Sequence, residues 1–142
     1  VFAGADLEQP WAELDGTLAD ALLAPHRSYL GLLRPILEEQ AGTIKALAHL
    51  TGGGFIENIP RVLPAGLSAR VRRGSWPVPA LFALTQERGQ IDPDEMLRVF
   101  NMGIGMVAVV AAQDAPRFQQ SLGEESWVIG ELIPGDGKVV LA

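Results

Sequence analysis

The glycine triplet at residues 52–54 constrains the fold of this chain more than any other feature of the sequence. The apolar run at residues 44–50 before it has the length and composition of a buried strand. Glycine adopts backbone angles that are closed to other residues and carries no Cβ atom, so the chain can turn sharply after this strand. Apolar residues then recur at helical spacing, at Phe55, Ile56, Ile59 and Val62. The sequence therefore predicts a strand, a loop of bare backbone and a short helix.

Such a loop has two interpretations. Free N–H groups before a helix favour an anion such as phosphate, because the amides and the helix dipole both attract negative charge. A glycine triplet can also be an ordinary tight turn. This one matches neither the GxxxxGK[ST] phosphate loop nor the GxGxxG dinucleotide loop, so the spacing alone leaves both interpretations open.

Length and composition limit the class of protein. A chain of 142 residues is large enough for one domain with a core, and 48% hydrophobic with 20% charged residues is typical of globular proteins. The net charge of −6 argues against a general nucleic-acid binder, which needs basic groups to neutralise phosphates. The absence of cysteine excludes disulfides and thiolate metal sites and is compatible with a cytoplasmic protein.

No membrane or secretion signal is apparent in the sequence. The longest apolar run, residues 102–112, is shorter than the roughly 20 residues that a membrane-spanning helix needs. No charged start followed by an apolar segment indicates a signal peptide. The chain opens on Val1 instead of Met, which suggests a fragment or a processed product.

Helices and strands are expected to alternate along the chain. Residues 1–14 read as a linker anchored by Phe2 and Trp11, and residues 134–137 as a turn that joins the last two strands in a hairpin. Thr17 and Asp20 are placed to form a capping box, and Asp92 to cap a helix that has Pro93 in its first turn. The expected helices cover 17–24, 29–40, 55–62, 79–88, 92–99 and 115–122, and the strands cover 44–50, 67–73, 106–111, 127–132 and 138–141.

The residues give little support to other catalytic or metal chemistry. There is no G-x-S-x-G nucleophile motif, and no catalytic residue can be named. The two histidines, His26 and His49, are far apart in the sequence and have no cysteine partners, so no metal site is expected.

Three strings resemble one known family. Residues 49–61 read HLTGGGFIENIPR, residues 25–29 read PHRSY where the family has P-T-R-x-Y, and residues 100–106 read FNMGIGM where it has FN-x-GxGM. Together, and in this order, they resemble the C-terminal half of phosphoribosylformylglycinamidine cyclo-ligase, also called aminoimidazole ribonucleotide synthetase. The match runs from about Leu14 to the C-terminus. His26 departs from the threonine of the family, which puts in doubt any hydroxyl contact at that position.

The resemblance implies a fold and a domain arrangement. The fold is expected to be α+β, three-layer α/β/α with a mixed β-sheet. Residues 1–14 would be the linker from a missing N-terminal ATP-binding half, and residues 15–142 the C-terminal domain. The full-length protein is expected to be cytoplasmic and a homodimer, with no nucleic-acid or membrane partner.

The activity implied is an ATP-dependent ring closure in purine biosynthesis. Formylglycinamidine ribonucleotide would become aminoimidazole ribonucleotide, with release of ADP and phosphate. ATP and Mg²⁺ are expected mainly on the missing N-terminal half, which is the main partner of this chain. The present chain would form the wall that contacts the ribonucleotide substrate, and it is expected to be inactive alone.

The resemblance and the loop pattern together give a set of expected binding residues. Asn58 could contact a ligand or stabilise the loop, and Arg61 could bind phosphate or pair with Glu57. The glycines near Asn101 could allow close approach of a ligand or only relieve crowding. Substrate or phosphate contacts are expected from His49, Thr51, Gly52, Gly53, Gly54, Asn58, Asn101 and Gly103, with Arg27, Tyr29 and Arg61 as secondary candidates.

Two other classes of function stay open. The chain could be the matching half of a related enzyme, such as selenophosphate synthetase, thiamine monophosphate kinase, the hydrogenase maturation dehydratase or formylglycinamidine ribonucleotide synthetase. It could also be a stand-alone module that binds a phosphorylated metabolite, or a purely structural domain. Ligand titration separates binding from structural roles.

Overall fold

The computed structural model describes all residues, 1–142, as an α+β domain. The helices are α1 (Leu18–Leu23), α2 (Leu30–Glu39), α3 (Gly54–Asn58), α4 (Ala80–Gly89), α5 (Pro93–Val99) and α6 (Ala115–Leu122), with 3₁₀ helices η1 (Ile59–Val62) and η2 (Ala112–Asp114). The strands are β1 (Pro10–Trp11), β2 (Gly16–Thr17), β3 (Ile44–His49), β4 (Leu67–Val71), β5 (Met106–Val110), β6 (Gly130–Pro134) and β7 (Val139–Leu141).

The strands form separate small sheets. β1 and β2 form an antiparallel pair, and β3 pairs with β5 in an antiparallel ribbon. β4 is the central strand of a mixed sheet, antiparallel to β6 and parallel to β7. The α+β class with mixed strand directions, expected from the resemblance, is thereby confirmed.

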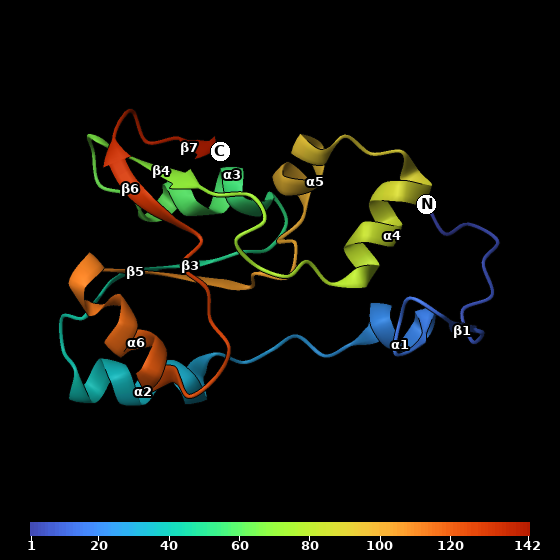
Figure 1. Ribbon diagram of the computed structural model, residues 1–142, viewed down its shortest axis with the longest axis horizontal. Coiled ribbons are helices and arrows are strands. Elements are labelled where there is room, and N and C mark those ends of the chain that lie inside the picture. Colours follow the sequence, from blue (N-terminus) through green and yellow to red (C-terminus); the bar gives the residue numbers. More distant parts are fainter.

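Two hydrophobic clusters hold the β3–β5 ribbon between helices and the mixed sheet (Figure 1). On one face, Leu33 and Ile36 of α2 meet Phe118 of α6 and pack against Leu47 and Ala108. On the other face lies the larger cluster, which joins the ribbon to α3, α5 and β4. Its most deeply buried members are Leu50, Phe55 and Met96. Alternate side chains of the two strands serve opposite clusters, as strand geometry requires.

The prediction of a hairpin at the C-terminus is wrong. β6 and β7 do not pair with each other, because β4 lies between them. The turn itself is present, and the buried Ser68 of β4 holds it: the Ser68 hydroxyl accepts from the Lys138 amide at 3.2 Å. Ser68 is only 2% exposed. Turn residues predict that the chain reverses, but not which strand it then joins.

Two helix starts expected from the sequence, those at Thr17 and Asp92, are confirmed. The Thr17 hydroxyl accepts from the Asp20 amide at 3.0 Å, and the Asp20 carboxylate accepts from the Thr17 amide at 3.0 Å, which completes the capping box. The Asp92 carboxylate accepts from the Asp94 amide at 2.8 Å at the start of α5. Pro79, expected as the first helical residue of α4, is instead its N-cap.

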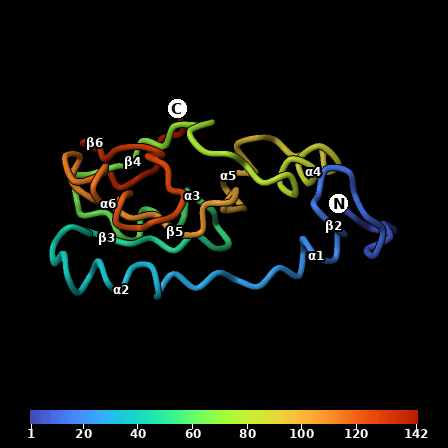
Figure 2. The backbone as a smooth tube through the Cα atoms, turned by 60° about the horizontal axis from the view of Figure 1, so that its bottom comes forward, coloured from blue at the N-terminus to red at the C-terminus, as the bar shows by residue number.

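The first residues of the chain pack beside α4 (Figures 1 and 2). The ring of Phe2 meets Trp11 edge to face at 5.9 Å, and the guanidinium of Arg88 lies 4.2 Å from the centre of the Trp11 ring. Phe2 and Trp11 thus act as the expected anchors. From α1 an extended segment, residues 24–29, runs along the molecule to α2 (Figure 2). None of the helices combines the length and apolar character that a membrane crossing requires.

The capping box makes a prediction about pH. Hydrogen bonds from the Thr17 hydroxyl and then from its amide hold the pKa of Asp20 below its usual value. A lowered folded-state pKa means that this contribution to the stability of α1 is present above the usual pKa and is lost as pH falls through the folded pKa. In a carbon-detected NMR titration, Thr17→Val is expected to raise the pKa of Asp20 towards its usual value.

Asp136 provides the control for that titration. Its pKa is lowered mainly by the Lys138 side chain, which lies at the other end of the chain, and should not respond to Thr17→Val. An Asp20 pKa unchanged by the substitution would show that the capping box does not form in solution.

Candidate functional site

The glycine triplet connects β3 to α3, and each glycine has a different environment. Gly53 and Gly54 adopt positive φ angles of 92° and 50°, which favour glycine. A Cβ atom on Gly54 would lie 2.3 Å from the carbonyl oxygen of Leu97 and 2.7 Å from that of Phe100. Gly54 is therefore required for close packing of α3 against the end of α5. Gly52 has no positive φ and nothing within 4 Å of a built Cβ.

The backbone amides of the triplet are only partly available to a ligand. The amide of Gly54 donates to the carbonyl of Thr51 at 3.1 Å and so closes a turn. The expectation of a ligand contact through this amide is therefore wrong, because an internal acceptor already uses it. The amides of Gly52 and Gly53 donate to no group in the chain.

Asn58 fixes the direction of these two free amides. It is 3% exposed, and its side-chain nitrogen lies 3.2 Å from the carbonyl oxygen of Gly52 and 3.5 Å from that of Thr51. All peptide bonds are trans, and in a trans peptide the C=O and the following N–H point in opposite directions. Carbonyls turned inward to Asn58 therefore turn the amides of Gly52 and Gly53 outward.

Asn58 thus has the loop-stabilising role that was one of its two interpretations. The same side-chain nitrogen makes its shortest hydrogen bond, 2.8 Å, to the Gly54 carbonyl, so its two N–H groups are shared among three carbonyls of the loop. Asn58 is buried, whereas Arg61, three residues later, is exposed. Arg61 takes part in none of the ion pairs of the chain, so pairing with Glu57, one of its two interpretations, is wrong.

The second glycine-containing loop lies directly beside the first. The Leu50 amide donates to the carbonyl of Gly105 at 2.8 Å, and the Asn101 side chain donates to the carbonyl of Leu50 at 3.4 Å. Antiparallel pairing of His49 with Met106 places both loops at the same end of the ribbon. The structure therefore brings Asn101 and Gly103 together with the glycine triplet, as the site prediction required.

The glycines of this second loop relieve crowding. A Cβ on Gly105 would lie 1.9 Å from the Tyr29 hydroxyl, and one on Gly103 would lie 2.5 Å from the ring of Pro79. The Asn101 side-chain oxygen accepts from the Gly103 amide at 3.0 Å and shapes the turn. Packing thus explains both glycines. A ligand contact at Gly103, which is exposed, stays a prediction.

The segment 24–29 adds a polar cluster at the same end of β3. The Nε2 atoms of His26 and His49 are 2.9 Å apart, and the Tyr29 ring meets the His49 ring edge to face at 6.2 Å. The Arg27 guanidinium lies 5.8 Å from the centre of the Tyr29 ring and pairs with Glu124. The assumption that the two histidines lie apart is wrong, because sequence separation does not reveal that this segment crosses the end of β3.

Ligands for a hard metal ion are not assembled on this chain. No group of three or more His, Asp or Glu side chains lies close enough together to hold a metal ion. Mg²⁺ prefers near-octahedral oxygen ligands, several of them carboxylate or phosphate oxygens. Because Mg²⁺ bound together with ATP needs only one or two protein carboxylates beside the phosphates, the location of a Mg²⁺–ATP site stays a prediction.

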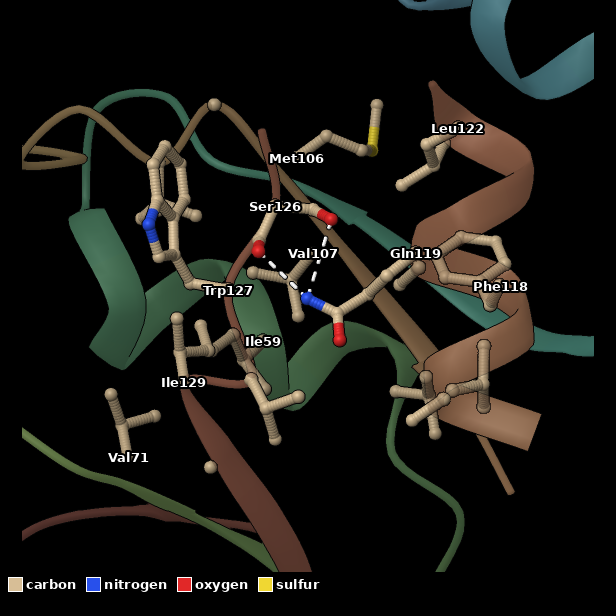
Figure 3. Close-up of a pocket in the computed structure, with 18 of the residues that line it drawn as sticks. Ile59, Val71, Met106, Val107, Phe118, Gln119, Leu122, Ser126, Trp127 and Ile129 are labelled. Atoms are coloured by element: carbon tan, nitrogen blue, oxygen red, sulfur yellow. Dashed lines mark hydrogen bonds between the residues drawn. The ribbon is translucent and has the colours of Figure 1, made fainter. Parts of the chain in front are cut away.

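A cavity of about 860 Å³ lies next to this cluster and was not predicted from the sequence (Figure 3). Its lining is mainly apolar and includes Phe118 and Leu122 of α6, Val107 of β5, and Trp127 and Ile129 before β6. The Gln119 side chain crosses it and donates to the Ser126 carbonyl at 2.7 Å (Figure 3). Every residue of β5 is half-buried, because the cavity runs beside that strand. The apolar run was compatible with the expected strand at 106–111, so it gave no signal of this space.

The cavity and the glycine loop are neighbours rather than one site. Arg27, Tyr29 and Gly103 line the cavity, whereas His49 and Asn58 do not. Residues 51–54 and Asn101 also lie outside its lining. The predicted binding residues therefore divide between the cavity rim and the exposed end of the β3–β5 ribbon.

Fold and site define a class: an α+β domain in which two glycine-containing loops meet at one end of a two-stranded ribbon. The chain belongs to the family described as AIR synthase related protein, C-terminal domain, whose model matches residues 2–142. The resemblance stated from the three strings is thus confirmed. Where the linker ends and the domain begins stays a prediction.

Relatives agree with this family, and a solved structure shares the fold. The chain is 46% identical over 138 residues to the phosphoribosylformylglycinamidine cyclo-ligase of Geobacillus thermodenitrificans, covering 95% of this chain and 39% of that protein. It is 48% identical over 132 residues to that of Alkaliphilus metalliredigens, covering 90% and 37%. The chain thus spans about two fifths of the length of these relatives. The crystal structure of E. coli HypE, a hydrogenase maturation protein, shares the fold, with a TM-score of 0.60 at 22% identity over 89% of this chain and 42% of that one.

The different environments of the glycines predict different effects of substitution. Gly54→Ala should lower the free energy of unfolding by at least about 2 kcal/mol, because it adds a left-handed backbone penalty to a clash with two carbonyls. Gly52→Ala is the matched control, and should change stability by no more than about 0.5 kcal/mol since its Cβ meets nothing. Urea unfolding followed by circular dichroism measures both. Equal destabilisation by the two substitutions would contradict this account of the loop.

Proposed function

We propose that this chain is the C-terminal, substrate-side half of an ATP-dependent cyclo-ligase that converts formylglycinamidine ribonucleotide to aminoimidazole ribonucleotide in purine biosynthesis. The family and the printed names of relatives at 43–48% identity support the proposal. Those names also favour the cyclo-ligase over selenophosphate synthetase or thiamine monophosphate kinase. The full-length enzyme would be cytoplasmic and dimeric, with the N-terminal half as the partner of this domain.

One observation carries the assignment of a substrate site: two adjacent amides, those of Gly52 and Gly53, are free and turned outward by Asn58. Two neighbouring N–H groups without an internal acceptor can both donate to one anion. The Glu57 carboxylate lies beside the second of them, since a Cβ atom built on Gly53 would be 2.5 Å from its Oε2. Gly52 has no neighbour within 4 Å of a built Cβ, so a ligand can approach the main chain closely.

Nearby side chains suit a phosphate or a phosphoryl group at this position. The side chains of Thr51, His49 and Arg61 are exposed beside or after the loop, where a hydroxyl, an imidazole and a guanidinium can bind an anion. Asn101 ties the second loop to Leu50 and keeps the two loops together. Arg27 is already paired with Glu124, which makes it a weaker candidate for direct phosphate contact.

ATP and Mg²⁺ belong, in this proposal, to the N-terminal half of the enzyme. On this chain no group of three or more His, Asp or Glu side chains could hold a metal ion, which is compatible with this division. Its part is to bind and orient the ribonucleotide.

The phosphate site is tested by titrating the ¹⁵N-labelled chain with ribose 5-phosphate. The amide signals of Gly52 and Gly53 should shift downfield and saturate, because both N–H groups gain an acceptor. The Gly54 amide should shift less, since it is already bonded to Thr51. Ribose without phosphate is the control ligand. Shifts that avoid Gly52 and Gly53, or equal responses to both sugars, would count against the proposed site.

The division of labour between the two halves gives a second test. Incubated with formylglycinamidine ribonucleotide, ATP and Mg²⁺, the 142-residue chain should release no ADP above a protein-free blank in a coupled assay. A full-length cyclo-ligase, such as that of Geobacillus thermodenitrificans, is the positive control. Turnover by the chain alone would show that it holds ATP itself.

A further inference from the structure

The only two histidines of the chain, 23 positions apart, meet in the folded structure. His49 is the last residue of β3, and pairing with Met106 fixes its backbone. His26 lies on the extended segment between α1 and α2, outside any helix or strand. Their Nε2 atoms are 2.9 Å apart, and both side chains are exposed.

We propose that His26 and His49 form a two-histidine chelate for a borderline divalent cation, of which Zn²⁺ and Ni²⁺ are the test cases. Imidazole nitrogen is a preferred ligand of both ions. With metal–nitrogen distances of about 2.0–2.1 Å, nitrogens 2.9 Å apart subtend roughly 90° at the ion. That is the angle between neighbouring positions of an octahedral or square-planar ion. Rotation of the exposed His26 ring widens it towards the tetrahedral angle.

The proton in the hydrogen bond between the His26 and His49 rings does not prevent metal binding, because it can move to another ring nitrogen. In the metal-free state one Nε2 donates to the other, so one ring carries its proton on Nε2. Metal binding needs both Nε2 lone pairs, and the proton moves through water to Nδ1 of the same ring. Neither Nδ1 takes part in a hydrogen bond of the chain, so both are free to carry a proton. The exchange leaves both rings neutral.

Charge and access also favour a cation here. The nearest guanidinium, that of Arg27, is paired with Glu124 and so is partly neutralised. The chain as a whole carries a net charge of −6. Two protein ligands leave the remaining coordination positions to water, so the site is expected to bind more weakly than a four-ligand structural zinc site. This proposal does not depend on the cyclo-ligase reaction.

The test is isothermal titration of the untagged 142-residue chain with NiCl₂, and separately with ZnCl₂. One ion per chain should bind. His26→Gln and His49→Gln should each weaken binding by at least about tenfold, because loss of an outer-shell partner alone already costs about 10-fold to 100-fold. Glu8→Gln, which removes an exposed carboxylate from the N-terminal segment, should leave the affinity unchanged.

A second measurement separates a chelate from general metal adhesion. In ¹⁵N NMR spectra the ring nitrogens of both histidines should change together when Zn²⁺ is added, and saturate at one equivalent. Absence of stoichiometric binding, or binding that survives both histidine substitutions, overturns the proposal. His26 is exposed and outside regular structure, so His26→Gln should keep the fold and decides the question even if His49→Gln unfolds.

Discussion

The close approach of backbone to backbone at Gly54 is the contact on which the functional end of the molecule depends. With no Cβ at this position, the start of α3 can sit against the carbonyls of Leu97 and Phe100. That contact seals one side of the cluster that contains Phe55 and Met96, both fully buried. It also sets the loop after β3 beside the loop before β5. A side chain here would separate the two loops and open the core at the same time.

Asn58 determines which polar backbone groups of the packed loop face outward. A buried side-chain amide must be hydrogen-bonded, and here it is bonded to carbonyls of the loop itself. In a trans peptide the C=O group and the N–H group point in opposite directions. Because the Asn58 side chain binds the loop carbonyls from the interior, the N–H groups of the same peptides face outward. One buried residue therefore stabilises the loop and, in the proposed site, leaves hydrogen-bond donors for a negatively charged ligand. The fold and the proposed anion site share a single cause.

Local chemistry made much of the fold predictable. The Thr17–Asp20 capping box and the Asp92 cap depend on neighbours within a few residues, and the structure has both. Errors arose where distant partners decide. The turn at residues 134–137 could not reveal that β4 separates β6 from β7, and nothing in the spacing of His26 and His49 shows that their rings meet. Likewise, the directions of the Gly52 and Gly53 amides follow from Asn58, whose side-chain orientation no local pattern specifies.

The three glycines answer different physical requirements, and this difference bears on function. Gly54 is explained by packing and Gly53 by its positive φ angle. At Gly52 neither reason holds, since its backbone is ordinary and any side chain would project into open space. The fold would tolerate alanine there, although alanine would cover part of the approach to the two free amides. In the proposed anion site, glycine at this position would leave the two free amides open to a ligand.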